Sequence, residues 1–139
     1  MMSSEKTVVE YLNPEGLHKN PAYSQVVLTQ SSAKTIYIGG QNSVNVKGEI
    51  VGKGDIKAQA EKILENINIA LQAGGAMLEN LIKWNVYIVQ GQPAQPAFEV
   101  FMKELRSIAN PPLITLAYVS GLAHPDFLME IDAIAVVPE

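Results

Sequence analysis

The chain has 139 residues, enough for one domain with a substantial core, and we expect a single domain over residues 1–139. It contains no cysteine and only two histidines, which excludes disulfides and thiolate chemistry, and no acidic loop has metal-binding spacing, so we expect neither a metal nor a cofactor. The formal net charge of -4 comes without a basic block, which argues against a nucleic-acid partner.

Three strand candidates come first in the chain. β-branched and aromatic residues predict a strand over 7–12, which the turn residues 13–16 end. Residues 26–29 and 35–38 predict two more strands, joined as a hairpin by a loop of about five residues. At 39–41 the last of them reaches Gly-Gly-Gln, where adjacent glycines permit a bulge or a close approach of the backbone to a ligand.

Two amphipathic helices follow, separated by a strand. The glycines of residues 47–54 lack the Gly-Lys-Ser/Thr ending of a phosphate loop and predict a surface turn. Asp55 is a suitable N-cap for a helix that ends at Gly74-Gly75. A second helix is predicted over 97–108. The apolar stripe of the first helix is Ile56, Ala60, Ile63, Leu64, Ile67 and Leu71, and that of the second is Phe98, Phe101, Met102, Leu105 and Ile108.

The strand between the helices, residues 81–89, has two distinct faces. Alternation predicts that one face is the apolar one and that the other is more polar. The apolar face is Ile82, Trp84, Val86 and Ile88, and the other is Lys83, Asn85, Tyr87 and Val89.

Two strands close the chain, over 113–119 and 127–137. The second is long and almost wholly apolar, as expected of a central strand. It also carries Glu130 and Asp132, which point to the same side of the strand, roughly 6.5 Å apart. Buried carboxylates are rare without a partner or a functional role, so two interpretations stay open. Either the two carboxylates accept hydrogen bonds from a neighbouring loop or pair with a lysine near a sheet edge, or they belong to a functional site.

This element order predicts an α+β two-layer sandwich of about six strands with two helices on one face. The opposite sheet face is left bare. Charged residues make up 17% of the chain, against roughly 25% in an average soluble domain. We infer that copies of the chain cover one another's bare faces, so that several sheets close into a barrel-like core.

The ends and the apolar runs predict the cellular setting. Residues 1–6 lack the basic segment and apolar core of a signal peptide. No apolar run approaches the roughly 18 residues of a membrane span. We therefore expect a cytoplasmic protein without membrane contact.

Taken together, several motifs resemble the YjgF/Rid family of reactive intermediate deaminases, also called endoribonuclease L-PSP-like. The motifs stand in the family's order: Tyr23-Ser24-Gln25, Tyr37-Ile38-Gly39-Gly40-Gln41, the helix 55–75, the strand 81–88 and Glu130-Ile131-Asp132-Ala133-Ile134-Ala135. The last is the most specific. The resemblance implies a chorismate-mutase-like fold and a homotrimer with small-molecule clefts between subunits.

The resemblance also implies site residues. Members of the family hydrolyse 2-imino or enamine acids to 2-oxo acids and ammonia. Carried across, Glu130 orients the attacking water, Tyr23 lines the cleft, and Gly40 and Gln41 bind substrate. The family arginine that grips the substrate carboxylate is missing from this chain. Its position falls on Ile114 or, with a shift of one residue, on Thr115.

Because the family arginine is missing, we consider three functions. The first is a small-molecule-binding homotrimer, of altered specificity or weak in imine deamination. The second is a working 2-iminobutanoate or enamine deaminase, a hydrolase acting on C=N bonds. The third is a non-catalytic interaction protein with holdase-like behaviour. An uncharged residue in place of a buried charged anchor costs about 3 to 5 kcal/mol, which favours the first.

Overall fold

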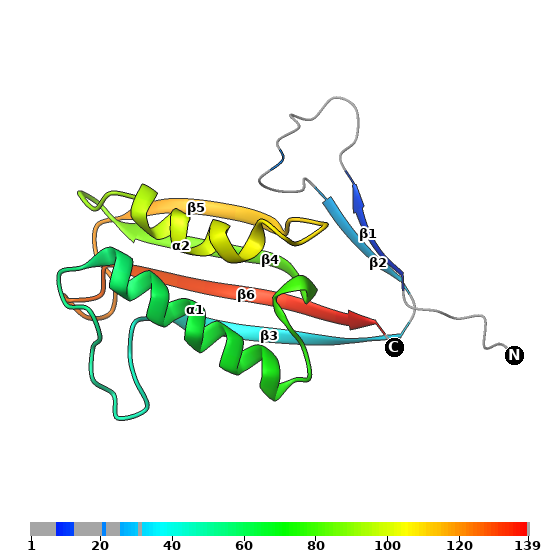
Figure 1. Ribbon diagram of the computed structural model, residues 1–139, viewed down its shortest axis with the longest axis horizontal. Helices are drawn as coiled ribbons and strands as arrows, with labels where there is room; N and C mark the ends of the chain where they lie inside the picture. Colours follow the sequence, from blue (N-terminus) through cyan, green and yellow to red (C-terminus); the bar gives the residue numbers. More distant parts are fainter. Residues whose placement is uncertain (1–7, 13–20, 22–25, 31, 139) are drawn as a thin grey trace, which may run out of the picture.

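The computed structural model describes residues 8–12, 21, 26–30 and 32–138 (Figure 1). Within these ranges the elements are β1 (Val8–Leu12), β2 (Val26–Gln30), β3 (Ala33–Gln41), α1 (Ile56–Ala73), a 3-10 turn (Leu78–Asn80), β4 (Leu81–Val89), α2 (Gln95–Leu105), β5 (Leu113–Val119) and β6 (Met129–Pro138). All six predicted strands and both predicted helices are therefore present, with ends that differ by a few residues.

The main sheet has four strands in the order β3-β6-β4-β5. β6 runs antiparallel to β3 and β4, and β5 runs parallel to β4, which the crossover through α2 makes possible. β6 is an interior strand, as its apolar sequence predicts. α1 and α2 lie across one face of this sheet (Figure 1), which confirms the α+β class with both helices on one side.

The predicted hairpin between the second and third strands is wrong. β2 pairs along its whole length with β1, from Val26 opposite Leu12 to Gln30 opposite Val8, and these two strands form a separate sheet. β3 pairs instead with β6. β3 begins at Ala33 rather than at residue 35, and its partner β6 lies at the other end of the chain. The pairing therefore depends on a contact between distant segments, which the local strand pattern does not contain.

α1 anchors the core through the predicted stripe, and all six of its apolar residues are buried. The Asp55 side chain caps its first turn by accepting a hydrogen bond from the Ala58 N–H at 3.1 Å. Gly74 caps the other end, and Gly75 follows with a φ of 76°, a conformation that suits glycine. Against this stripe pack Ile38 of β3, Trp84, Val86 and Ile88 of β4, Phe101 and Leu105 of α2, and Met129, Ile131, Ala133 and Ala135 of β6.

Two boundaries differ from the sequence pattern. Leu81 is buried in place of the predicted Ile82, because the pairing of β4 with β6 shifts register between Leu81 and Lys83. α2 ends at Leu105 rather than at Ile108, although Ile108 still packs against the core. Neither change disturbs the alternation over the rest of β4, so the faces of its central residues are as predicted.

Candidate functional site

The sheet face opposite the helices, called here the open face, carries the polar residues of β6. Met129, Ile131 and Ala133 are buried under the helices, so the alternating Glu130 and Asp132 point to the open face. Pairing with the neighbouring strands places Glu130 and Asp132 in two rows of residues that run across the sheet. One row is Gly40, Glu130, Tyr87 and Ala117, and the other is Asp132, Asn85 and Thr115.

Asp132 has a structural partner on the neighbouring strand. The Asn85 side-chain N–H donates a hydrogen bond to the Asp132 carboxylate at 2.7 Å, and the two residues are directly opposite in register. The predicted interpretation of a hydrogen-bonded carboxylate therefore describes Asp132, with an asparagine rather than a loop or a lysine as its partner. Such a charge-assisted bond holds the carboxylate in one orientation.

Glu130 differs from Asp132 in having no such partner. Its half-buried side chain makes no hydrogen bond or ion pair with any residue that the structure describes. It lies instead against the backbone of Gly40, so closely that a Cβ added to Gly40 would collide with the carboxylate oxygen and lie 2.8 Å from the carboxyl carbon. The carboxylate is thus available to a ligand or a water on the open face.

Gly40 lies beside the Glu130 side chain because β3 is irregular at this point. The pairing of β3 with β6 shifts between Ile38 and Gln41, which is the bulge that adjacent glycines permit. The Gln41 side chain turns back and donates a hydrogen bond to the Gly39 carbonyl at 3.1 Å. Gly40 is therefore beside Glu130, whereas Gln41 lies past the bulge, at the strand end.

The structure separates the two candidates for the arginine position. Ile114 pairs with Trp84 and packs against the hydrophobic core, so it lies on the helix side of the sheet. Thr115 pairs with Asn85, is exposed and lies on the open face. The fold brings Thr115 into the rows that contain Glu130 and Asp132, and it does not bring Ile114 there.

Other predicted or candidate residues lie elsewhere. Tyr23 lies outside the residues that the structure describes. Arg106, the only arginine in the chain, caps the C-terminus of α2 in the helix layer. Lys83 lies on the open face and is half-buried. In the described ranges it is the one cationic side chain on this face of the main sheet, and it makes no ion pair there.

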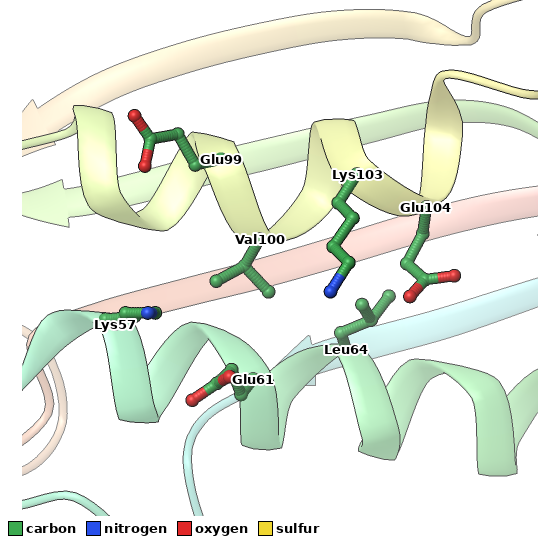
Figure 2. A pocket seen from close by; sticks show the side chains of 7 residues that line it. All are labelled: Lys57, Glu61, Leu64, Glu99, Val100, Lys103 and Glu104. Carbon is green, nitrogen blue, oxygen red and sulfur yellow. The ribbon is translucent and has the colours of Figure 1, made fainter.

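Two grooves flank α1. The first, of about 440 Å³, runs between α1 and α2 on the side away from the open face (Figure 2). Charged side chains of both signs and two apolar ones line it: Lys57, Glu61, Leu64, Glu99, Val100, Lys103 and Glu104. The second, of about 700 Å³, lies between α1 and the segment after β3, and it includes Gly40 and Gln41. These two predicted binding residues therefore line a concave surface at the β3 edge.

Two further observations concern metal binding and membrane-spanning helices. No group of three or more His, Asp or Glu side chains among the described residues is arranged to hold a metal ion. No helix in those ranges is long and apolar enough to cross a membrane.

Sequence reasoning missed two asparagines that make hydrogen bonds beside or to the carboxylates. Asn85 was placed on the polar face of its strand, but its bond to Asp132 depends on the pairing of β4 with β6, which the sequence does not reveal. Asn42 was not singled out, although its side chain donates a hydrogen bond to the Met129 carbonyl at 3.2 Å, next to Glu130. Its position directly after Gly-Gly-Gln was the available signal.

Comparisons with known proteins agree on one family. The endoribonuclease L-PSP family model matches residues 16–137. A RutC family protein of Pyrococcus horikoshii is 37% identical over 114 residues, covering 81% of this chain and 85% of that protein. A 2-iminobutanoate/2-iminopropanoate deaminase of Dermatophagoides farinae is 27% identical over 138 residues, covering 98% and 99%. The crystal structure of YyfB, a Rid family protein of Yersinia pestis, superposes with a TM-score of 0.78 at 28% identity, covering 93% and 98%.

Proposed function

Because the chain belongs to the endoribonuclease L-PSP family, also called YjgF/Rid, we propose that it is a homotrimer with small-molecule sites between subunits. Three features support self-association through the open face. Among the residues that the structure describes, no helix lies over this face (Figure 1). It exposes the aromatic side chain of Tyr37 to 77%. The chain as a whole is poor in charge, with 17% charged residues.

The chemistry we propose at this site is hydrolysis of a C=N bond, with Glu130 orienting the water. Water adds to the imine carbon, the nitrogen takes up a proton, and the resulting carbinolamine releases ammonia and leaves a carbonyl compound. A carboxylate that accepts a proton from the attacking water assists this addition. The observation that carries the proposal is the Glu130 carboxylate itself, which faces the open side against Gly40 and has no structural partner among the described residues.

The specificity we propose differs from that of a 2-imino acid hydrolase. Thr115, the candidate arginine position on the open face, cannot pair with a substrate carboxylate as a guanidinium does. Glu130 and Asp132 outnumber Lys83 on the same face, so a carboxylate there meets net repulsion. The proposed substrates are therefore small imines or enamines without a carboxylate, and imino acids are poor substrates.

The test compares two imines generated in place. An amino-acid oxidase produces 2-iminobutanoate, and an amine oxidase produces a neutral imine from a simple primary amine. The rate of imine loss is followed by trapping the remainder with semicarbazide. We expect acceleration of the neutral imine, loss of that acceleration in Glu130→Gln, and no loss in Glu99→Gln, a carboxylate on the helix side.

The relative from Dermatophagoides farinae supports a second candidate function, because it is named a 2-iminobutanoate/2-iminopropanoate deaminase and aligns over 98% of this chain. Strong acceleration of 2-iminobutanoate by the wild-type protein would favour that function and contradict the altered specificity. Binding of a ligand with a rise in melting temperature, but no turnover of either imine, would contradict the catalytic proposal.

A pair of arginine substitutions tests the position of the missing anchor. Thr115→Arg places a cation on the open face, and we expect it to improve turnover of 2-iminobutanoate relative to the neutral imine. Ile114→Arg places the cation against the core, and we expect lower stability without that gain. A gain from Ile114→Arg alone would contradict the placement.

A further inference from the structure

A line of amide side chains connects α1 to the residue before Glu130. The Asn66 side-chain N–H groups donate to the backbone carbonyls of Asn42 and Val44, both at 3.1 Å. The Asn42 side chain in turn donates to the Met129 carbonyl at 3.2 Å. The line therefore runs from a helix, through the end of β3, to the start of β6.

A second amide holds the same end of β6 from the other side. Gln59 of α1 is fully buried, and its side-chain oxygen accepts the Leu128 N–H at 3.0 Å. Its N–H groups donate to the carbonyls of Gly52 and Asp126 at 3.1 and 2.9 Å. Asn42, Gln59 and Asn66 are called here the amide brace. Together they fix the backbone of the two residues that precede Glu130.

The brace coincides with the irregular part of the sheet. The β3 bulge lies between Ile38 and Gln41, and Asn42 is the first residue after the strand. Through its bond to Met129, Asn42 ties the end of the bulged segment to the strand that carries Glu130. The bulge interrupts the ladder between Ile38 and Gln41, and beyond it the register gives only the pair Gln41 and Ile131, so the Asn42 bond is a second tie at this end of the two strands. Loss of this bond leaves the pairing of Gln41 with Ile131 as the tie between the bulged end of β3 and the start of β6, so we expect the two segments to shift more easily.

A shift there acts directly on Glu130, because its carboxylate is located by contact with Gly40 rather than by hydrogen bonds to described residues. We infer that Asn42, held by Asn66, is a positioning residue that sets where the Glu130 carboxylate lies against Gly40. This inference rests on the function proposed above for Glu130, and it adds a residue that acts through Glu130 without touching the reacting atoms.

The test uses Asn42→Ala, with Gln72→Ala as the matched control. Gln72 is an exposed amide on α1 that lies outside the brace. Turnover of the neutral imine is measured in kcat and KM. We expect kcat to fall by about tenfold to a hundredfold, as a displacement of about 1 Å of a catalytic group produces. KM should change little, because Glu130 acts on water rather than on ligand binding.

A second readout does not depend on turnover. In protein labelled at the glutamate side-chain carboxyl carbon, NMR locates the Glu130 signal by its absence in Glu130→Gln. We expect Asn42→Ala to move this signal and the Gly40 amide signal, and Gln72→Ala to move neither. Asn42→Asp, which removes the donor but keeps the shape, should reproduce both effects and serves if the alanine variant does not fold.

The outcomes separate the two proposals. A folded Asn42 variant with unchanged Glu130 and Gly40 signals would overturn the positioning role, whatever the turnover. A wild-type protein without imine turnover would overturn the proposed function alone, and the NMR comparison would still decide the role of Asn42. A parallel fall of kcat in Gln72→Ala would also overturn the positioning role, because the effect would then be general to α1.

Discussion

Gly40→Ala is the sharpest perturbation of the candidate site, because it alters the position of one carboxylate and little else. The added Cβ would lie 2.8 Å from the carboxyl carbon of Glu130. Carbon atoms in contact settle at about 3.5 to 4.0 Å, so the carboxylate must move by about 1 Å. A displacement of that size costs about a hundredfold in rate, or about 2.7 kcal/mol in the activation barrier.

Stability should hardly change in the same variant. The colliding group is the far end of a flexible side chain, and it has no hydrogen bond to lose among the described residues. The backbone angle of Gly40 is not in the left-handed region, so alanine is tolerated there. Replacing glycine also lowers the entropy of the unfolded chain, which stabilises by about 0.4 to 1 kcal/mol and offsets residual strain.

The neighbouring glycine provides the control. A Cβ on Gly39 would meet nothing within 4 Å, so Gly39→Ala changes the same strand without touching Glu130. Imine turnover and melting temperature are measured for both variants. We expect loss of turnover only in Gly40→Ala, at a nearly unchanged melting temperature. Equal turnover in the two folded variants would refute the contact between Gly40 and Glu130 as a determinant of function.

Three further predictions concern stability. Asp55→Ala should lower the free energy of unfolding in denaturant by about 1 kcal/mol, because it removes the N-cap of α1. Gln59→Leu should lower it by about 3 kcal/mol, since three part-buried backbone partners lose their bonds, whereas Gln72→Leu should change it little. Burial raises the pKa of Tyr11 above 10.0. Its contribution to stability is therefore present below pH 10.0 and lost as the pH rises through the folded-state pKa, and Tyr11→Phe should remove this dependence in thermal melts.

The parts of the fold that the sequence predicts are those with strong local signals. α1 has a capping aspartate, a stripe of six apolar residues and a terminal glycine pair, and each acts as expected. The interior place of β6 follows from its length and apolar character. Pairing is different, because which strands meet depends on contacts far apart in the chain. The hairpin of β2 with β3 is a reasonable local prediction that fails for this reason.

In the candidate site, too, some features follow from local sequence patterns and others depend on distant contacts. Alternation along β6 is enough to place Glu130 and Asp132 on one face, but their different roles depend on neighbours from other strands. Asp132 is opposite an asparagine that donates to it, and Glu130 is beside a glycine that leaves room for it. These neighbours come from β4 and β3, at sequence separations of more than 40 residues. No local pattern contains that information.

Which of Ile114 and Thr115 stands at the position of the missing arginine has the largest consequence for the proposed function. The alternation of side chains along β5 determines which of the two lies on the open face. Adjacent residues of a strand face opposite ways, so a shift of one residue moves a side chain from the core to the open face. Thr115 is opposite Asn85, which is opposite Asp132, so it belongs to the polar row. A side chain at Thr115 can reach a ligand on the open face, whereas one at Ile114 can only alter packing under α2. Of these two positions, Thr115 is the one at which a carboxylate anchor would face the polar row, which is why Thr115→Arg rather than Ile114→Arg tests the proposed specificity.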